Sequence, residues 1–227
     1  MPTPAPLAPP EGILKRFHEI GITLDEAAVV KLGDYLARLL AMSEHMSLTG
    51  IKDPIEAWEK LVLDALTLMP LLAELRAGAR LVDVGSGGGI PGIPLAIARP
   101  DLHVTLVEAT QKKAAFLSAV AAALGLSNVA VRAERAEHLG AGELRATFDA
   151  VTARAVARLA MLVPLTAPFA KPGGVLLLVK GQRADEELAE AAGVLQKQRT
   201  VHEKTVATPT GKIVVLRRRE SHLMAPR

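Results

Sequence analysis

The sequence predicts an α/β fold, in which a mostly parallel seven-stranded sheet ends in an antiparallel hairpin and follows a helical N-terminal extension. Apolar residues at helical spacing occupy residues 12–78, and strand-like runs alternate with helical segments from residue 79 onward. The last two strand-like runs are too close together for a helix to fit between them, which predicts the hairpin. Half of the 227 residues are apolar, enough for one core plus an appendage.

The N-terminal part consists of a proline-rich lead and a helical region. Residues 1–11 are predicted to be disordered or extended, and they lack the charge and apolar pattern of a signal peptide. Residues 12–78 are predicted to be helical and to end at Gly78. Thr23-Leu-Asp-Glu26 matches a capping box, and Asp53-Pro54 has the pattern of a second helix start. The apolar positions expected to face the core are Val29, Leu32, Leu36, Leu39, Leu40, Trp58, Leu61, Leu66 and Leu68.

Residues 79–219 are predicted to form the main domain, and residues 220–227 a tail. Parallel strands are expected at 80–84, 103–107, 129–133, 147–153 and 174–180, and the hairpin at 200–206 and 212–216. The clearest intervening helix runs from Gln111 to Leu124 and is closed by Gly125. Right-handed crossovers through such helices make the first strands parallel.

A glycine-rich turn follows the first of these strands. Asp83 lies at the end of the strand, and Gly85, Gly87 and Gly89 lead into a short helical pattern at 93–98. Glycines allow a ligand to approach the backbone closely, and the next helix presents unpaired amides. The second strand ends in Glu108, where an acid can hold a ribose hydroxyl. The pattern therefore predicts an adenosine-bearing cofactor.

Two alignments of the glycines point to different cofactors. Gly87-x-Gly89-x-x-Gly92 matches the dinucleotide fingerprint, which would indicate a nicotinamide-dinucleotide-dependent oxidoreductase. Acid-x-Gly-x-Gly-x-Gly, beginning at Asp83, resembles motif I of Rossmann-like class I S-adenosylmethionine-dependent methyltransferases. The terminal hairpin favours the second alternative. A methyltransferase acting on a small molecule and a non-catalytic adenosine-binding regulator remain further alternatives.

Further segments carry a more specific resemblance. The glycine turn continues as Ile90-Pro-Gly-Ile-Pro-Leu-Ala96, with both prolines, and the other matching segments are residues 47–54, 63–66, 108–117, 135–137 and 152–157. In order and spacing these segments resemble the RsmG (GidB) family, bacterial methyltransferases of guanine N7 in 16S ribosomal RNA of the small subunit. The resemblance covers residues 12–218. Ser47, Leu61 and Ala65 depart from the family pattern, so no chemical role is assigned to those three side chains.

The resemblance implies S-adenosyl-L-methionine as the cofactor and assigns roles to individual residues. Glu108 would accept from the ribose, Ala136 and Glu137 would lie around the adenine, and Arg154 would help to position the reactants. The complete expected cofactor site is Asp83, Gly85, Ser86, Gly87, Gly89, Ile90, Glu108, Ala109, Thr110, Ala136, Glu137 and Arg154. Guanine N7 already carries a free lone pair, so its methylation needs no general base. Without cysteines or metal-ligand spacing among the six histidines, no metal site is expected.

The charge balance bears on partners. A net charge of +3 permits phosphate contacts, while six aromatic residues are too few for stacking platforms. The resemblance to the RsmG (GidB) family implies 16S ribosomal RNA or the small ribosomal subunit as partner, and we also expect no membrane, a monomer and a cytoplasmic location. The absence of a long apolar run and of cysteines agrees with this. Phosphate contacts are expected from Lys112, Arg135, Lys180 and Arg183, with Lys113, Arg132, Arg217, Arg218 and Arg219 as further candidates.

Overall fold

The computed structural model describes residues 4–154 and 157–220. Its strands are β1 (Arg80–Val84), β2 (His103–Val107), β3 (Val129–Arg132), β4 (Phe148–Arg154), β5 (Ala170–Lys180), β6 (Thr200–Ala207) and β7 (Lys212–Arg218). Its α-helices are α1 (Ile13–Glu19), α2 (Glu26–Ser43), α3 (Pro54–Ala57), α4 (Asp64–Leu66), α5 (Gly92–Ala98), α6 (Gln111–Ala123), α7 (Ala136–Ala141), α8 (Leu159–Thr166), α9 (Ala184–Glu190) and α10 (Ala192–Lys197). A π-helix, η1 (Trp58–Leu63), and two 3₁₀ helices, η2 (Met69–Leu72) and η3 (Ala167–Phe169), complete the elements.

The seven strands form one sheet in the order β3-β2-β1-β4-β5-β7-β6. The pairs from β3 through β5 are parallel, whereas β7 runs antiparallel to both β5 and β6. This confirms the predicted mostly parallel sheet with its terminal hairpin. The chain leaves β1 toward β2 on one side and later returns to β4 on the other. In open α/β sheets, ligands bind where the strand order reverses in this way, outside the carboxyl ends of the strands.

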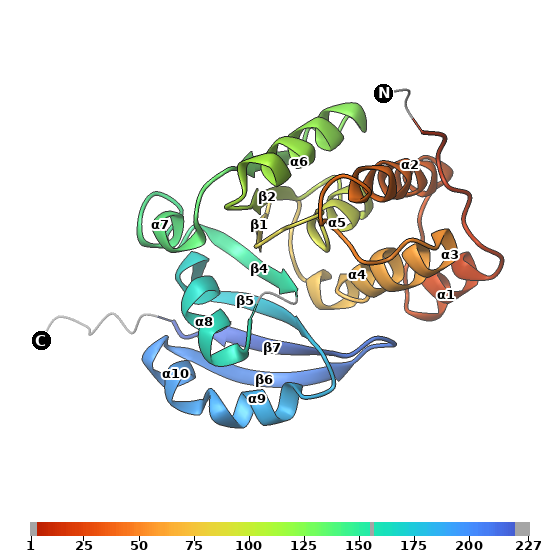
Figure 1. The fold of residues 1–227 in the computed structure, drawn as a ribbon. Coiled ribbons are helices and arrows are strands. Elements are labelled where there is room, and N and C mark those ends of the chain that lie inside the picture. Colours follow the sequence, from red (N-terminus) through yellow and green to blue (C-terminus); the bar gives the residue numbers. More distant parts are fainter. Residues whose placement is uncertain (1–3, 155–156, 221–227) are drawn as a thin grey trace, which may run out of the picture.

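Helices cover both faces of the sheet, and the N-terminal helices belong to one of them (Figure 1). Side chains along β5 alternate between the two faces: Leu177 belongs to the part of the core that contains residues of α1, α2, α5 and α6, while Leu176 and Leu178 belong to the part that contains residues of α7, α8 and α10. The N-terminal helical part therefore shares one continuous core with the sheet.

Local sequence explains how the N-terminal elements begin. Asp25 caps α2 by accepting a hydrogen bond from Ala28 N at 2.7 Å, so the helix begins two residues later than the capping box at Thr23 predicts. Asp53 caps α3 as predicted, accepting from Glu56 N at 2.8 Å. The helical pattern after Asp53 is divided into α3, the π-helix and α4, a break that the apolar spacing did not predict.

The proline-rich lead is described from residue 4. Residues 4–10 form no helix or strand, and the Leu7 amide donates to Gly33 O of α2 at 3.1 Å. Residues 1–3, Ala155, Val156 and all but the first residue of the predicted tail lie outside the described residues. No helix in the described ranges is long and apolar enough to cross a membrane.

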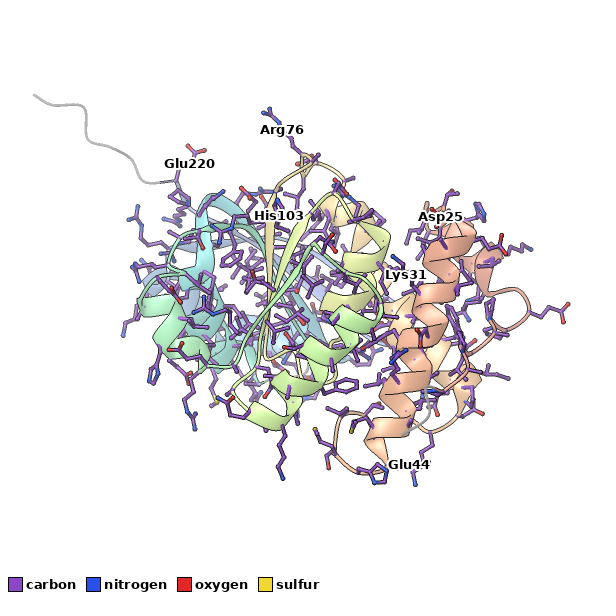
Figure 2. All side chains as sticks on the ribbon, turned by 90° about the horizontal axis from the view of Figure 1, so that it is seen from above. Asp25, Lys31, Glu44, Arg76, His103 and Glu220 are labelled. Carbon is purple, nitrogen blue, oxygen red and sulfur yellow. The ribbon has the colours of Figure 1, made fainter. Side chains whose placement is uncertain are left out.

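Figure 2 fixes the orientation of α2 on the sheet. His103, which begins β2, lies toward the same end of the molecule as Arg76 and Asp25, and Glu44 lies at the opposite end (Figure 2). The carboxyl end of α2 is therefore at the edge where the parallel strands finish.

Candidate cofactor and active site

The turn between β1 and α5 forms a backbone cradle. Gly85 and Gly87 have φ values of 73° and 56°, in the left-handed region that favours glycine. A Cβ atom on Gly87 would meet only Gly85 O, at 3.9 Å. The turn thus has open space beside Gly87, where a ligand could approach the main chain.

Glu108 connects this turn to the start of α6. Its Oε2 accepts from Gly87 N at 2.9 Å, and its Oε1 accepts from Thr110 N at 2.7 Å. The residue is 8% exposed, and each carboxylate oxygen keeps further lone-pair capacity. A carboxylate held in this way fits the predicted acceptor for ribose hydroxyls.

Asp83 lies beneath the turn and supports it from inside. It is 1% exposed, and Thr152 Oγ1 donates to its Oδ1 at 2.9 Å. Burial raises the pKa of Asp83 to about 6, against the opposing effect of this hydrogen bond. Ser86 is also buried, and its Oγ donates to the Asp83 carbonyl at 2.9 Å. Both side chains therefore have hydrogen-bond partners within the protein, and contact of Ser86 with a cofactor stays a prediction.

The N-terminal part supplies a residue to the turn that the sequence did not reveal. The Tyr35 hydroxyl of α2 donates to Gly88 O at 2.9 Å. Burial, and next the nearby charge of Asp83, raise the pKa of Tyr35 well above its usual value, so the phenol is a neutral donor. A tyrosine within the apolar stripe of Leu32, Leu36 and Leu39 was the signal that could have found it.

The remaining cofactor candidates differ in their surroundings. Gly89 is explained by packing, because a Cβ there would lie 2.7 Å from Ile93 Cγ1 and 3.0 Å from Leu117 Cδ2. Their exposure also varies: Ile90 and Ala136 are half-buried, while Ala109, Thr110 and Glu137 are exposed. Their contacts with a cofactor stay predictions.

Arg154 is held by the N-terminal part at the end of β4. Its Nη2 donates to Lys60 O at 2.8 Å and lies 3.3 Å from Asp64 Oδ2. The Arg154 side chain is 22% exposed. Register places Thr152 beside Asp83, so Arg154 lies just beyond the central strand at the ligand-binding edge. Asp64 was not a predicted site residue, although a charge inside the apolar run of residues 61–66 could have indicated it.

The structure separates the predicted RNA-binding cations. Lys180 Nζ lies 2.9 Å from Glu187 Oε2 and donates to Ala157 O, and its side chain is 7% exposed. This buried ion pair argues against the predicted phosphate contact of Lys180. Arg183 is exposed and pairs with Glu186 at 2.8 Å. An exposed ion pair contributes little free energy, so Arg183 can exchange this partner for another at little cost.

The other cations lie at opposite edges of the sheet. Lys112 and Arg135 follow β2 and β3 at the carboxyl edge, and both are exposed. Arg217 pairs with Val175 near the start of β5, so the arginines at 217–219 lie at the edge away from the glycine turn. Arg132 is engaged by Glu143. Contact of Lys112 and Arg135 with RNA stays a prediction.

The described residues contain no group of three or more His, Cys, Asp or Glu side chains arranged to hold a metal ion.

Comparisons with known proteins show the family of this chain. The family model GidB, described as rRNA small subunit methyltransferase G, matches residues 28–216. The chain is also 72% identical over 218 residues to Ribosomal RNA small subunit methyltransferase G of Sorangium cellulosum, covering 96% of this chain and 91% of that protein. The chain belongs to the GidB family.

Solved structures show the fold of this GidB-family chain in more distant proteins. A ribosomal protein methylase from Lactobacillus delbrueckii subsp. bulgaricus superimposes with a TM-score of 0.55 at 15% identity, covering 71% of this chain and 79% of that one. P. horikoshii TYW2, solved in complex with MeSAdo, gives a TM-score of 0.51 at 15% identity, with coverage of 65% and 60%. The fold is the Rossmann-like class I methyltransferase fold, and the oxidoreductase alternative is not favoured.

Proposed function

We propose that this protein transfers the methyl group of S-adenosyl-L-methionine to N7 of a guanine in 16S ribosomal RNA. Membership of the GidB family and the class I methyltransferase fold support the reaction class. The observation that carries the cofactor assignment is the Glu108 carboxylate, which is shared by the amides of Gly87 and Thr110. It places a fixed acceptor between the glycine turn and α6.

The residues present fit such a cofactor. The backbone at Gly87 leaves open space for its methionine end, and Glu108 has lone pairs for the ribose hydroxyls. By family resemblance, Ala136 and Glu137 would lie around the adenine. When bound, the cofactor supplies an electrophilic methyl group on a sulfonium sulfur.

The chain itself has mainly to orient the reactants. Guanine N7 has an unprotonated lone pair in the major groove, so no side chain needs to remove a proton from it. Alignment of the lone pair with the methyl group can supply about 7–11 kcal/mol of the barrier reduction. In this proposal the rigid turn and the anchored Arg154 hold the site, while the RNA is positioned from outside.

Cations around the carboxyl edge suggest where RNA docks. Lys112 and Lys113 lie in the first turn of α6, which contains no acidic residue. Positive charge at a helix N-terminus is unfavourable, so phosphate binding gives these lysines a reason to be there. Arg135 precedes α7 at the same edge. The protein would act as a monomer on 16S ribosomal RNA or the small subunit, in the cytoplasm.

Methyl transfer measured side by side on three substrates tests the proposal. Unmodified 30S subunits, free 16S ribosomal RNA and a metabolite pool are incubated with tritiated S-adenosylmethionine, and labelled RNA is digested to nucleosides. We expect 7-methylguanosine from an RNA substrate. Label confined to metabolites would indicate a small-molecule methyltransferase, and no transfer despite product binding would indicate a non-catalytic regulator.

The cofactor site is tested separately with Glu108→Ala. Loss of a charge-assisted hydrogen bond should weaken S-adenosylhomocysteine binding by about 1.5–3 kcal/mol, roughly ten- to hundredfold in Kd by calorimetry. Glu19→Ala, at an exposed residue of α1, is the matched control and should bind normally. Unchanged affinity of the Glu108 variant would remove this residue from the site.

A further inference from the structure

Asp64 is a buried carboxylate at the meeting point of three elements. It is 2% exposed and begins α4 directly after the π-helix. The hydroxyl of Thr210 in the β6–β7 turn donates to its Oδ1, and Thr208 Oγ1 lies 3.4 Å from the same oxygen. Its Oδ2 receives no hydrogen bond from the described residues, and the Arg154 guanidinium lies 3.3 Å away.

The π-helix supplies a second contact to the same guanidinium. The Asp64 amide donates to Glu59 O, five residues back, and to Leu61 O, instead of to Lys60 O as it would in an α-helix. This leaves Lys60 O free to accept from Arg154 Nη2 at 2.8 Å. The widened turn and the carboxylate that follows it therefore converge on one nitrogen of Arg154.

The buried Asp64–Arg154 ion pair and the π-turn before it would give little stability if they served packing alone. A buried ion pair is often no more stabilising than apolar side chains of similar volume, and π-turns are rare outside functional sites. Here both fix Arg154 at the edge of the sheet where the candidate site lies. Among the described residues, the remaining nitrogens of Arg154, Nε and Nη1, have no hydrogen-bond partner.

We propose that Asp64 is a positioning residue that holds Arg154 for cofactor binding. Asp64 acts through Arg154 and does not touch the cofactor itself. The proposal rests on the proposed function in one respect, namely that Arg154 lines the cofactor site. The Thr210 hydroxyl holds Asp64 in turn, so the terminal hairpin and the N-terminal helical part together complete the site.

A double-mutant cycle with S-adenosylhomocysteine tests the dependence. We expect Asp64→Asn and Arg154→Met each to weaken binding about tenfold, and the double variant to bind no more weakly than Arg154→Met alone. Asp34→Asn, which removes the Asp34–Arg38 ion pair of α2, is the control and should bind normally. Wild-type affinity of the Asp64 variant, or effects that multiply in the double variant, would overturn the proposal.

A second readout needs no cofactor. The rate at which phenylglyoxal modifies Arg154, followed by peptide mass spectrometry, should rise several-fold in Asp64→Asn and remain unchanged in Asp34→Asn. An unchanged rate would show that Asp64 does not hold Arg154, whatever the cofactor result. Failure of the wild type to bind S-adenosylhomocysteine would instead refute the proposed function. If Asp64→Asn does not fold, Thr210→Val should raise the same rate two- to threefold, and a wild-type rate there would refute the proposal.

Discussion

Replacing Asp83 with asparagine should remove a pH-dependent cost of folding. Burial raises the pKa of Asp83 from 3.8 to about 6 in the folded protein. Each pKa unit is worth about 1.4 kcal/mol, so keeping this carboxylate ionised costs roughly 3 kcal/mol at pH 7. The folded state binds the proton more tightly than the unfolded state. The contribution of Asp83 to stability is therefore fully present below pH 3.8 and is lost as the pH rises through about 6.

An asparagine at this position would keep the shape of the side chain without the titration, which isolates this contribution from those of other acids. The free energies of unfolding of the wild type and Asp83→Asn are measured in urea at pH values between 4 and 7. We expect the variant to gain about 2.4 kcal/mol relative to the wild type between pH 4 and pH 7, because about 0.6 kcal/mol of the total is already present at pH 4. Thr152 can still donate to the amide oxygen, so the hydrogen bond at Oδ1 is preserved.

Asp101→Asn provides a control of opposite sign. The Asp101 carboxylate accepts from Arg99, and this hydrogen bond lowers the pKa of Asp101. Its contribution to stability is present at neutral pH and is lost as the pH falls through the lowered pKa. The Asp101→Asn variant should therefore have a lower free energy of unfolding than the wild type at neutral pH, and this difference should shrink as the pH falls. A wild-type minus Asp83→Asn difference that stays flat from pH 4 to pH 7 would refute the burial argument for Asp83.

Two further predictions concern the lead and the RNA surface. Gly33→Ala would place a Cβ 2.3 Å from Leu7 O, so it should lower the free energy of unfolding in urea by about 1–3 kcal/mol. In a protein that lacks residues 1–7, the same substitution should be neutral or should stabilise the fold by up to about 1 kcal/mol. A destabilisation that persists after the deletion would contradict packing of the lead against α2. Charge reversal of Lys112 and Lys113 should make the logarithm of the RNA-binding constant fall less steeply with the logarithm of the salt concentration. The slope should decrease in magnitude by about 0.7–0.9 for each phosphate that the variant no longer neutralises. Lys197→Glu, on α10, is the control and should leave the slope unchanged. An unchanged slope would place RNA docking elsewhere.

The sequence was sufficient to predict the sheet because its information is local. Every predicted strand is present, with ends that differ by a few residues, and the hairpin follows from the short link before Lys212. Strand β5 begins at Ala170, ahead of the predicted residue 174, because pairing of Phe148 with Ala170 extends it. Such an extension depends on a neighbouring strand, which apolar spacing alone does not specify.

The site was predictable only in part, for the same reason. Glycines and terminal acids mark the ends of strands, so the turn and Glu108 could be located from the sequence. Charge alone could not distinguish Lys180 from Lys112. Lys180 is buried against Glu187, whereas Lys112 is exposed in the first turn of α6. Burial of Lys180 depends on how α9 and the segment at Ala157 pack around the end of β5, and the sequence pattern does not specify that packing.

The N-terminal helical part is better understood as a component of the site than as an appendage. Its helices share a core with the sheet, and Tyr35 reaches the glycine turn through Gly88. Asp64 and the π-turn reach Arg154 from the same side. A change that loosens this part would therefore alter the turn and the anchored arginine together. Loss of activity from a substitution in the N-terminal helices would not require that the substituted residue contact RNA or cofactor.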